Sequence, residues 1–217
     1  MNKAFIFDMD GVVIDSENAW DKYGGNFLQN LLGKEITDKI GDTIGMTVNT
    51  IYDIASKNGF SMDREEYFKL YDKRAADVYS KSQLTPGIEK LAEKLISLGF
   101  KIGLVTSSRS IWAKNVLPRL SFADRIDCFI SINDRSDLRP KPAPDAYLEA
   151  IEKLGITPKS TIVLEDSNSG IKAAKASGAY VIGFRQNLVP GYVQKGADIY
   201  AENIEEVIKI IERGPKS

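Results

Sequence analysis

The sequence contains no histidine and a single cysteine, Cys128. Without histidine, the chain cannot form a Ser-His-Asp or Cys-His nucleophilic site, or a His-ligated zinc or haem site. One cysteine can form neither an internal disulfide nor a thiolate metal cluster, and this agrees with a reducing cytosol. Any chemistry must therefore use carboxylates, hydroxyls, lysine, arginine or the backbone.

The chain also lacks a strong net charge and a long apolar run. Its 217 residues carry a formal net charge of −1, so no basic field suggests a nucleic-acid partner. No apolar segment is long enough to span a bilayer, and Asp8 comes too early for a signal peptide. We expect a cytoplasmic protein with no nucleic-acid or membrane partner, present as a monomer or weak dimer.

Short apolar runs alternate with segments of helical period over most of the chain. The runs predict strands at residues 4–7, 102–105, 128–132, 161–164 and 180–184. Helices are predicted at 86–98, 144–154, 170–177 and 203–213. The first two helices are expected to face inward through Ile88, Leu91, Leu95 and Leu98, and through Tyr147, Leu148, Ile151 and Leu154. This alternation predicts an α/β fold, with a Rossmann-like parallel sheet covered on both faces.

One region departs from this alternation. Residues 16–85 show no convincing strand and are helical in period at 23–32, 47–55 and 64–79. We therefore predict a small helical domain at 16–85, inserted after the first strand into a core made of residues 1–15 and 86–217.

Polar side chains follow the predicted strands where each strand ends. In parallel α/β sheets, ligands bind at this edge. Acids there can hold Mg²⁺, and hydroxyls, backbone N–H groups and lysine can hold a phosphate. Each stretch alone is more common as a turn, a helix cap or a solvated loop, but their joint appearance indicates one phosphoryl-transfer site. The residues are Asp8 and Asp10, Thr106, Ser107 and Ser108, Lys141, and Glu165, Asp166 and Ser167.

Four stretches resemble the motifs of the haloacid dehalogenase (HAD) superfamily, in its Asp-nucleophile phosphatase and phosphomutase branch. They are FDMDGVVIDSE, LVTSS, RPKPAPD and LEDSNSG, and the resemblance extends from residue 5 to residue 178. The inserted segment resembles the helical cap domain found in that branch, which closes over the site and selects the substrate.

The resemblance implies a role for each motif residue. Asp8 would be the nucleophile that forms an aspartyl-phosphate, Asp10 the general acid–base, and Lys141 the cation that neutralises developing charge. The Mg²⁺ ligands would be Asp8, the Asp10 carbonyl and Asp166, with Glu165 in an outer shell or as an alternative ligand and Ser167 supporting the loop. The phosphate would be bound by the N–H groups of Met9 and Asp10, by Thr106 and by the Ser107 N–H.

The sequence gives weaker evidence for the residues that contact the rest of the substrate than for the motif residues. Glu17 is a candidate contact, and Trp20 is expected chiefly to pack within the cap. The turn Gly45-Met46-Thr47 is another candidate, although it also fits a simple helix entry. Arg109 either reaches a second phosphate or an acid on the substrate, or lies on a solvated face.

The function expected from this resemblance is a Mg²⁺-dependent phosphatase for a small phosphorylated metabolite, such as a sugar phosphate or a phosphoglycolate-like compound. A β-phosphoglucomutase-like mutase is the alternative, although those enzymes share a cap-hinge histidine that this chain lacks. A non-catalytic phosphate-binding protein or phosphoacceptor is the alternative of another class. The intact Asp8, Asp10, Lys141 and Asp166 argue against a protein that only binds phosphate. The other form is a phosphoacceptor domain. Such a domain is shorter and takes its acceptor aspartate from the third strand.

Overall fold

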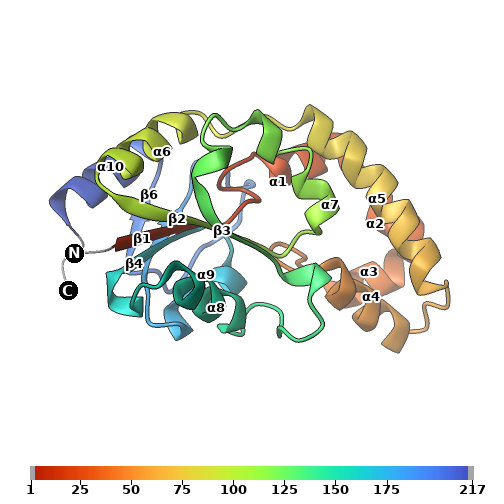
Figure 1. The fold of residues 1–217 in the computed structure, drawn as a ribbon. Helices are drawn as coiled ribbons and strands as arrows, with labels where there is room; N and C mark the ends of the chain where they lie inside the picture. Colours follow the sequence, from red (N-terminus) through yellow and green to blue (C-terminus); the bar gives the residue numbers. More distant parts are fainter. Residues whose placement is uncertain (1–2, 215–217) are drawn as a thin grey trace.

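The sheet has six strands, five of which lie where the sequence predicted them. They are β1 Lys3–Phe7, β2 Phe100–Thr106, β3 Ile126–Ser131, β4 Thr161–Glu165, β5 Tyr180–Phe184 and β6 Ile199–Ala201. In the computed structural model, which describes residues 3–214, all pairings are parallel and the order is β3-β2-β1-β4-β5-β6 (Figure 1). The predicted α/β parallel-sheet class is confirmed.

Helices cover both faces of this sheet. One face carries α6 (Ile88–Ser97) and α10 (Ile204–Arg213), and the other carries α8 (Asp145–Leu154) and α9 (Asn168–Ala176) (Figure 1). Each helix presents an apolar stripe, such as Ile88, Leu91 and Leu95 of α6, all of which are buried. Because both faces are covered, the continuously apolar β1 is buried from Ala4 to Phe7.

The segment between β1 and α6 contributes no strand to this sheet. Its helices are α1 Ser16–Ala19, α2 Phe27–Leu32, α3 Lys34–Ile40, α4 Val48–Lys57 and α5 Arg64–Lys81, with a π-helical turn at Trp20–Gly24. The two chain crossings lie side by side, because the Asp15 N–H donates to Gln83 O at 2.9 Å and the Thr85 N–H donates to Val13 O at 3.0 Å. We therefore propose the division predicted from the sequence, into a core (1–15 and 86–217) and a cap (16–85), within the part of the chain described.

Several details of the prediction were wrong. Leu98 and Leu148 are exposed, at 46% and 44%, because Leu98 caps the end of α6 and α8 packs through Tyr147, Ala150 and Ile151 instead. The helix predicted at 23–32 is broken at Gly25, whose φ of +54° ends the first turn. Four short elements were not predicted, namely β6, α1, α3 and α7 (Ser110–Ala113). Short 3₁₀ turns lie at Leu117–Arg119, Ala123–Arg125, Ile132–Asp134 and Pro158–Ser160.

Within residues 3–214, no helix combines the length and the apolar character that crossing a bilayer requires.

Candidate active site

The carboxyl end of β1 lies in the middle of one sheet edge. β2 and β4 flank this strand, and Phe7 is in register with Leu104 on one side and Leu164 on the other. The loops after these three strands therefore begin together, at the point where the strand order reverses. They carry the acids and hydroxyls that the sequence predicted to converge.

A buried ion pair joins Lys141, from the loop before α8, to Asp8. Lys141 Nζ lies 2.6 Å from Asp8 Oδ1, and both side chains are nearly inaccessible to solvent. Burial by itself would lower the pKa of Lys141, but the charges of Asp8 and Glu165 outweigh it and raise that pKa well above its ordinary value. Lys141 is therefore a fixed cation beside Asp8.

Glu165 also contacts the Lys141 ammonium, and it does not line the cavity described below. Besides its contact with the Lys141 ammonium, Glu165 Oε1 accepts the Tyr147 hydroxyl at 2.6 Å. Its Oε2 accepts the backbone N–H and the hydroxyl of Ser167, both at 3.1 Å. Since both oxygens are already in use, the geometry favours the outer-shell role expected for Glu165 over direct metal ligation.

Asp8 and Asp166 are buried acids with too little positive charge around them. Burial raises the pKa of Asp8 well above its ordinary value, against the opposing effect of Lys141. Burial, followed by the charges of Glu165 and Asp8, raises the pKa of Asp166 in the same direction. The Asp166 carboxylate accepts no hydrogen bond from residues 3–214, and it packs against Gly11, where a Cβ would overlap it. Lys141 alone does not offset the burial of the two acids, so the site favours a further cation.

A magnesium ion fits this donor set. No three His, Cys, Asp or Glu side chains in the described part of the chain form a ready-made metal cage. Mg²⁺ does not need one, because it is usually held by one or two carboxylates, together with waters and phosphate oxygens. Asp8 and Asp166 could supply the carboxylates. The Asp10 side chain is engaged elsewhere, so only its backbone carbonyl is available as the third protein ligand.

The Asp10 carboxylate accepts four hydroxyl hydrogen bonds. Ser16 donates to Oδ1 at 2.8 Å, and the Tyr79 hydroxyl donates to the same oxygen. Thr106 and Ser108 donate to Oδ2 at 3.1 and 2.8 Å. Thr106 is fully buried and its hydroxyl is directed to Asp10, so we assign it to holding Asp10 rather than to touching a phosphate.

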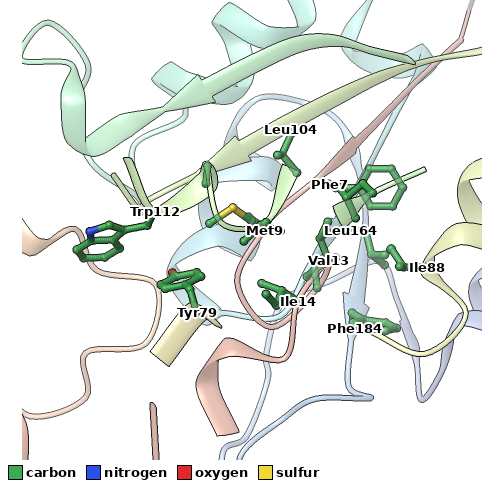
Figure 2. Packing of buried hydrophobic residues seen from close by; sticks show 14 of the residues in the cluster. Phe7, Met9, Val13, Ile14, Tyr79, Ile88, Leu104, Trp112, Leu164 and Phe184 are labelled. Atoms are coloured by element: carbon green, nitrogen blue, oxygen red, sulfur yellow. The ribbon is translucent and has the colours of Figure 1, made fainter. Parts of the chain in front are cut away.

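Backbone N–H groups at the same edge are free to bind an anion. Those of Met9, Asp10 and Ser107 donate no hydrogen bond within residues 3–214. The Met9 side chain itself is fully buried and belongs to the core cluster that also contains Tyr79 and Trp112 (Figure 2). Free donors beside Asp8 agree with the phosphate contacts expected of Met9, Asp10 and Ser107.

A cavity of ≈ 220 Å³ lies between this edge and the cap. From the core, it is lined by Asp8, Asp10, Ser107, Ser108, Trp112, Asp166 and Ser167. The cap lines the rest through mostly apolar side chains together with Glu17. The cap turn at Gly45 meets the core directly, since Ser107 Oγ donates to the Gly45 carbonyl at 3.0 Å.

Comparisons with known proteins agree with this geometry. Residues 5–184 match the family model described as haloacid dehalogenase-like hydrolase. The chain belongs to this family. It is 30% identical over 179 residues to hexitol phosphatase B of Escherichia coli (strain K12), covering 80% of this chain and 79% of the relative. It is 29% identical over 216 residues to β-phosphoglucomutase of Bacillus subtilis (strain 168), covering 94% and 91%.

A solved structure, of a hydrolase from Pseudomonas syringae, shares the fold with a TM-score of 0.75 at 24% identity, over 98% of this chain and 99% of that chain. Membership of the family, together with its phosphatase relatives, makes this haloacid dehalogenase-like hydrolase an enzyme of the phosphatase type.

Only some of the candidate substrate residues of this hydrolase line the cavity. Glu17 lines the cavity, and its pKa is raised to about 8 by burial and by the charges of Asp10, Asp42 and Asp15. Trp20 also lines the cavity, and its ring packs 5.7 Å from that of Tyr71, as expected of a cap packing residue.

Arg109 does not line the cavity. It forms an ion pair with Asp72 of α5, and its guanidinium lies 4.9 Å from the Phe68 ring centroid. Trp112 Nε1 donates to the same Asp72 at 2.7 Å. We therefore propose that Arg109 serves the contact between cap and core rather than the substrate.

Sequence reasoning missed two residues that hold the candidate catalytic groups. Tyr79 was expected only as the end of a helix, yet its hydroxyl reaches Asp10. Tyr147 was expected only as a core residue, yet its hydroxyl reaches Glu165. A buried tyrosine needs a partner for its hydroxyl, which is a signal, but it does not say which partner.

Proposed function

We propose that this enzyme is a Mg²⁺-dependent phosphatase that hydrolyses a small phosphorylated metabolite through an aspartyl-phosphate on Asp8. One observation carries the proposal. Asp8 lines the cavity with Oδ1 held by Lys141 at 2.6 Å, while Oδ2 accepts no hydrogen bond within residues 3–214. An oriented carboxylate with one free oxygen, beside free N–H donors and a fixed cation, is suited to attack phosphorus.

The chemistry would proceed in two steps. Asp8 Oδ2 forms a bond to phosphorus as the bond from phosphorus to the substrate oxygen breaks, and the protonated Asp10 carboxyl gives its proton to that leaving oxygen. Asp10, now ionised, then takes a proton from a water molecule whose oxygen attacks phosphorus. The bond from phosphorus to Asp8 breaks, which releases phosphate and restores both acids.

Mg²⁺, held by Asp8, Asp166 and the Asp10 carbonyl, would supply positive charge for the phosphoryl oxygens. The protein's own part is to keep Lys141 charged, to present the free N–H groups of Met9, Asp10 and Ser107, and to exclude bulk water with the cap. The four hydroxyls around Asp10 fix its position until a leaving group arrives.

A phosphomutase is the second candidate, because the similarity to the Bacillus subtilis β-phosphoglucomutase covers 94% of the chain. The absence of histidine speaks against it, since that leaves no histidine at the cap hinge. A phosphoacceptor domain is disfavoured by the position of Asp8 on the first strand and by the long helical insert.

Phosphate release from a panel of phosphorylated metabolites, with and without Mg²⁺, tests the proposal in the wild type and Asp8→Asn. Release that needs Mg²⁺ and is lost in Asp8→Asn is the expected result. Glucose 6-phosphate formed from β-glucose 1-phosphate, without free phosphate, would show a mutase instead. Full activity in Asp8→Asn would overturn the mechanism, provided that circular dichroism shows both proteins folded.

A further inference from the structure

The lining of the cavity is of two chemical kinds. The acids, hydroxyls and free N–H groups of the sheet edge are those that the proposed phosphatase needs for the phosphoryl group. The remaining lining, which would face the rest of the substrate, includes Glu17, Trp20, Phe27, Met46, Tyr71 and Trp112. Five of these six side chains are apolar or aromatic, so this part of the lining favours a carbon skeleton.

No lysine or arginine lines the cavity within the described residues. The cations nearest to it are already engaged. Lys141 lies below the floor between Asp8 and Glu165, and Arg109 is paired with Asp72. The Arg74 guanidinium lies 5.7 Å from the Phe27 ring centroid but does not reach the lining. A second phosphate or a carboxylate on the substrate would therefore find no cation to pair with, and burying an unpaired charge is costly.

The carboxyl groups that line the cavity belong to Asp8, Asp10, Glu17 and Asp166. Glu17 is the member supplied by the cap, and its carboxyl makes no hydrogen bond or ion pair with residues 3–214. It shares the cavity with the acids of the sheet edge and with the aromatic rings of Trp20, Phe27 and Tyr71. A carboxyl without a protein partner at such a place can accept hydrogen bonds from a ligand.

We propose that the alcohol part of the substrate is an uncharged polyol that gives a hydroxyl hydrogen bond to Glu17, and that phosphate esters with a second anionic group are rejected. This inference rests on the proposed phosphatase function and narrows it. It removes phosphoglycolate-like compounds from the substrates considered. It also disfavours the mutase, because an enzyme that returns its phosphoryl group to a sugar monophosphate must hold a bisphosphate.

Pairs of phosphate esters in which one member carries an additional anionic group test the inference. Glycerol 3-phosphate is compared with 3-phosphoglycerate, 2-hydroxyethyl phosphate with 2-phosphoglycolate, and fructose 6-phosphate with fructose 1,6-bisphosphate. In each pair we expect kcat/KM of the uncharged-alcohol member to be at least about tenfold higher, because the second anion would be buried in a cavity whose lining offers no cation. Equal or faster turnover of the anionic members would overturn the inference while leaving the phosphatase intact.

A binding measurement separates the inference from the function. If the wild type hydrolyses none of these esters, the proposed function fails. The affinities of the same pairs for the Asp8→Asn protein, measured by calorimetry with Mg²⁺ present, still decide the inference. Tighter binding of the uncharged-alcohol members supports it, and equal or weaker binding overturns it.

Variants of Glu17 test whether this residue causes the preference for uncharged alcohols. Glu17→Gln keeps the shape and removes the ionisable carboxyl, and Glu17→Lys supplies the missing cation. We expect the preference for uncharged alcohols to fall in Glu17→Gln, and to fall by about tenfold or more in Glu17→Lys. Glu66→Gln and Glu66→Lys, at an exposed position of α5, are the matched controls and should leave the preference unchanged. An unaltered preference in both Glu17 variants would overturn the role given to Glu17.

Discussion

The hydroxyl of Tyr79, near the end of the last cap helix, donates a hydrogen bond to the Asp10 carboxylate in the core. Burial and the Asp10 charge raise the pKa of Tyr79 well above its ordinary value, so this hydroxyl keeps its proton and remains a donor. The same hydroxyl lies 3.0 Å from Ser108 Oγ. The proposed acid–base group is thus held in part by the cap.

Tyr79→Phe removes this donor and leaves the ring in place. We expect kcat to fall by about tenfold with KM changed by less than about threefold, because the lost contact positions a reacting group and not the bound ground state. Steady-state kinetics on the best substrate of the panel measures both constants. Tyr67→Phe, on the same helix, is the matched control, because the buried Tyr67 hydroxyl has no partner within residues 3–214. A similar loss in both variants would contradict the positioning role.

Lys141→Met should destabilise the protein more at pH 8 than at pH 5. The pKa of Lys141 is raised, so in the wild type its stabilising charge is present throughout this range and is lost only above that raised pKa. In Lys141→Met, the raised pKa of Asp8 loses the one influence that lowers it, so the ionised acid costs stability as pH rises. We expect the free energy of unfolding to fall by about 3–5 kcal/mol at pH 8 and by less at pH 5. Urea unfolding of both proteins at the two pH values measures this difference. An equal loss of unfolding free energy at pH 5 and pH 8 would contradict the role given to the Lys141 charge.

Asp166→Asn should separate metal binding from folding. In EDTA at neutral pH, we expect this variant to be more stable than the wild type, because an acid with a raised pKa destabilises the fold once pH exceeds its unfolded value. Mg²⁺ at a hundred times its Kd should stabilise the wild type by about 2.7 kcal/mol and the variant by much less. Thermal unfolding with and without Mg²⁺ measures both effects. Equal stabilisation of the two proteins would remove Asp166 from the metal site.

Gly45→Ala should weaken docking of the cap on the core. Gly45 has φ +76°, and a Cβ there would overlap the hydroxyls of Ser167 and Ser169. We expect kcat/KM to fall by about tenfold or more, because a loosened cap admits water and misplaces Glu17. Gly59→Ala, in the cap with φ +97° and open space around it, controls for backbone strain alone. The docking role fails if both variants lose activity equally.

Much of the fold could be predicted because its signals are local. The short run at residues 161–164, rich in β-branched residues, favours a buried strand, and Ile88, Leu91 and Leu95 recur at helical spacing. The errors also have local causes. Leu98 continues the stripe of α6 by count, but it lies where the helix ends, and the three-residue β6 is too short to show a pattern.

The sequence by itself determined which chemical groups this protein can use and at which strand ends they stand. Without histidine, and with acids, hydroxyls and one lysine in the right order, a carboxylate-based phosphoryl-transfer site was the reading that the residues favoured. Only the tertiary structure decided which side chains hold these groups and what closes over them. The contacts of Tyr79 with Asp10, of Tyr147 with Glu165 and of Arg109 with Asp72 join segments 18 to 69 residues apart. Such pairings depend on how helices pack on the sheet and on one another, and that packing is set by the shape of the whole core, which no local pattern encodes.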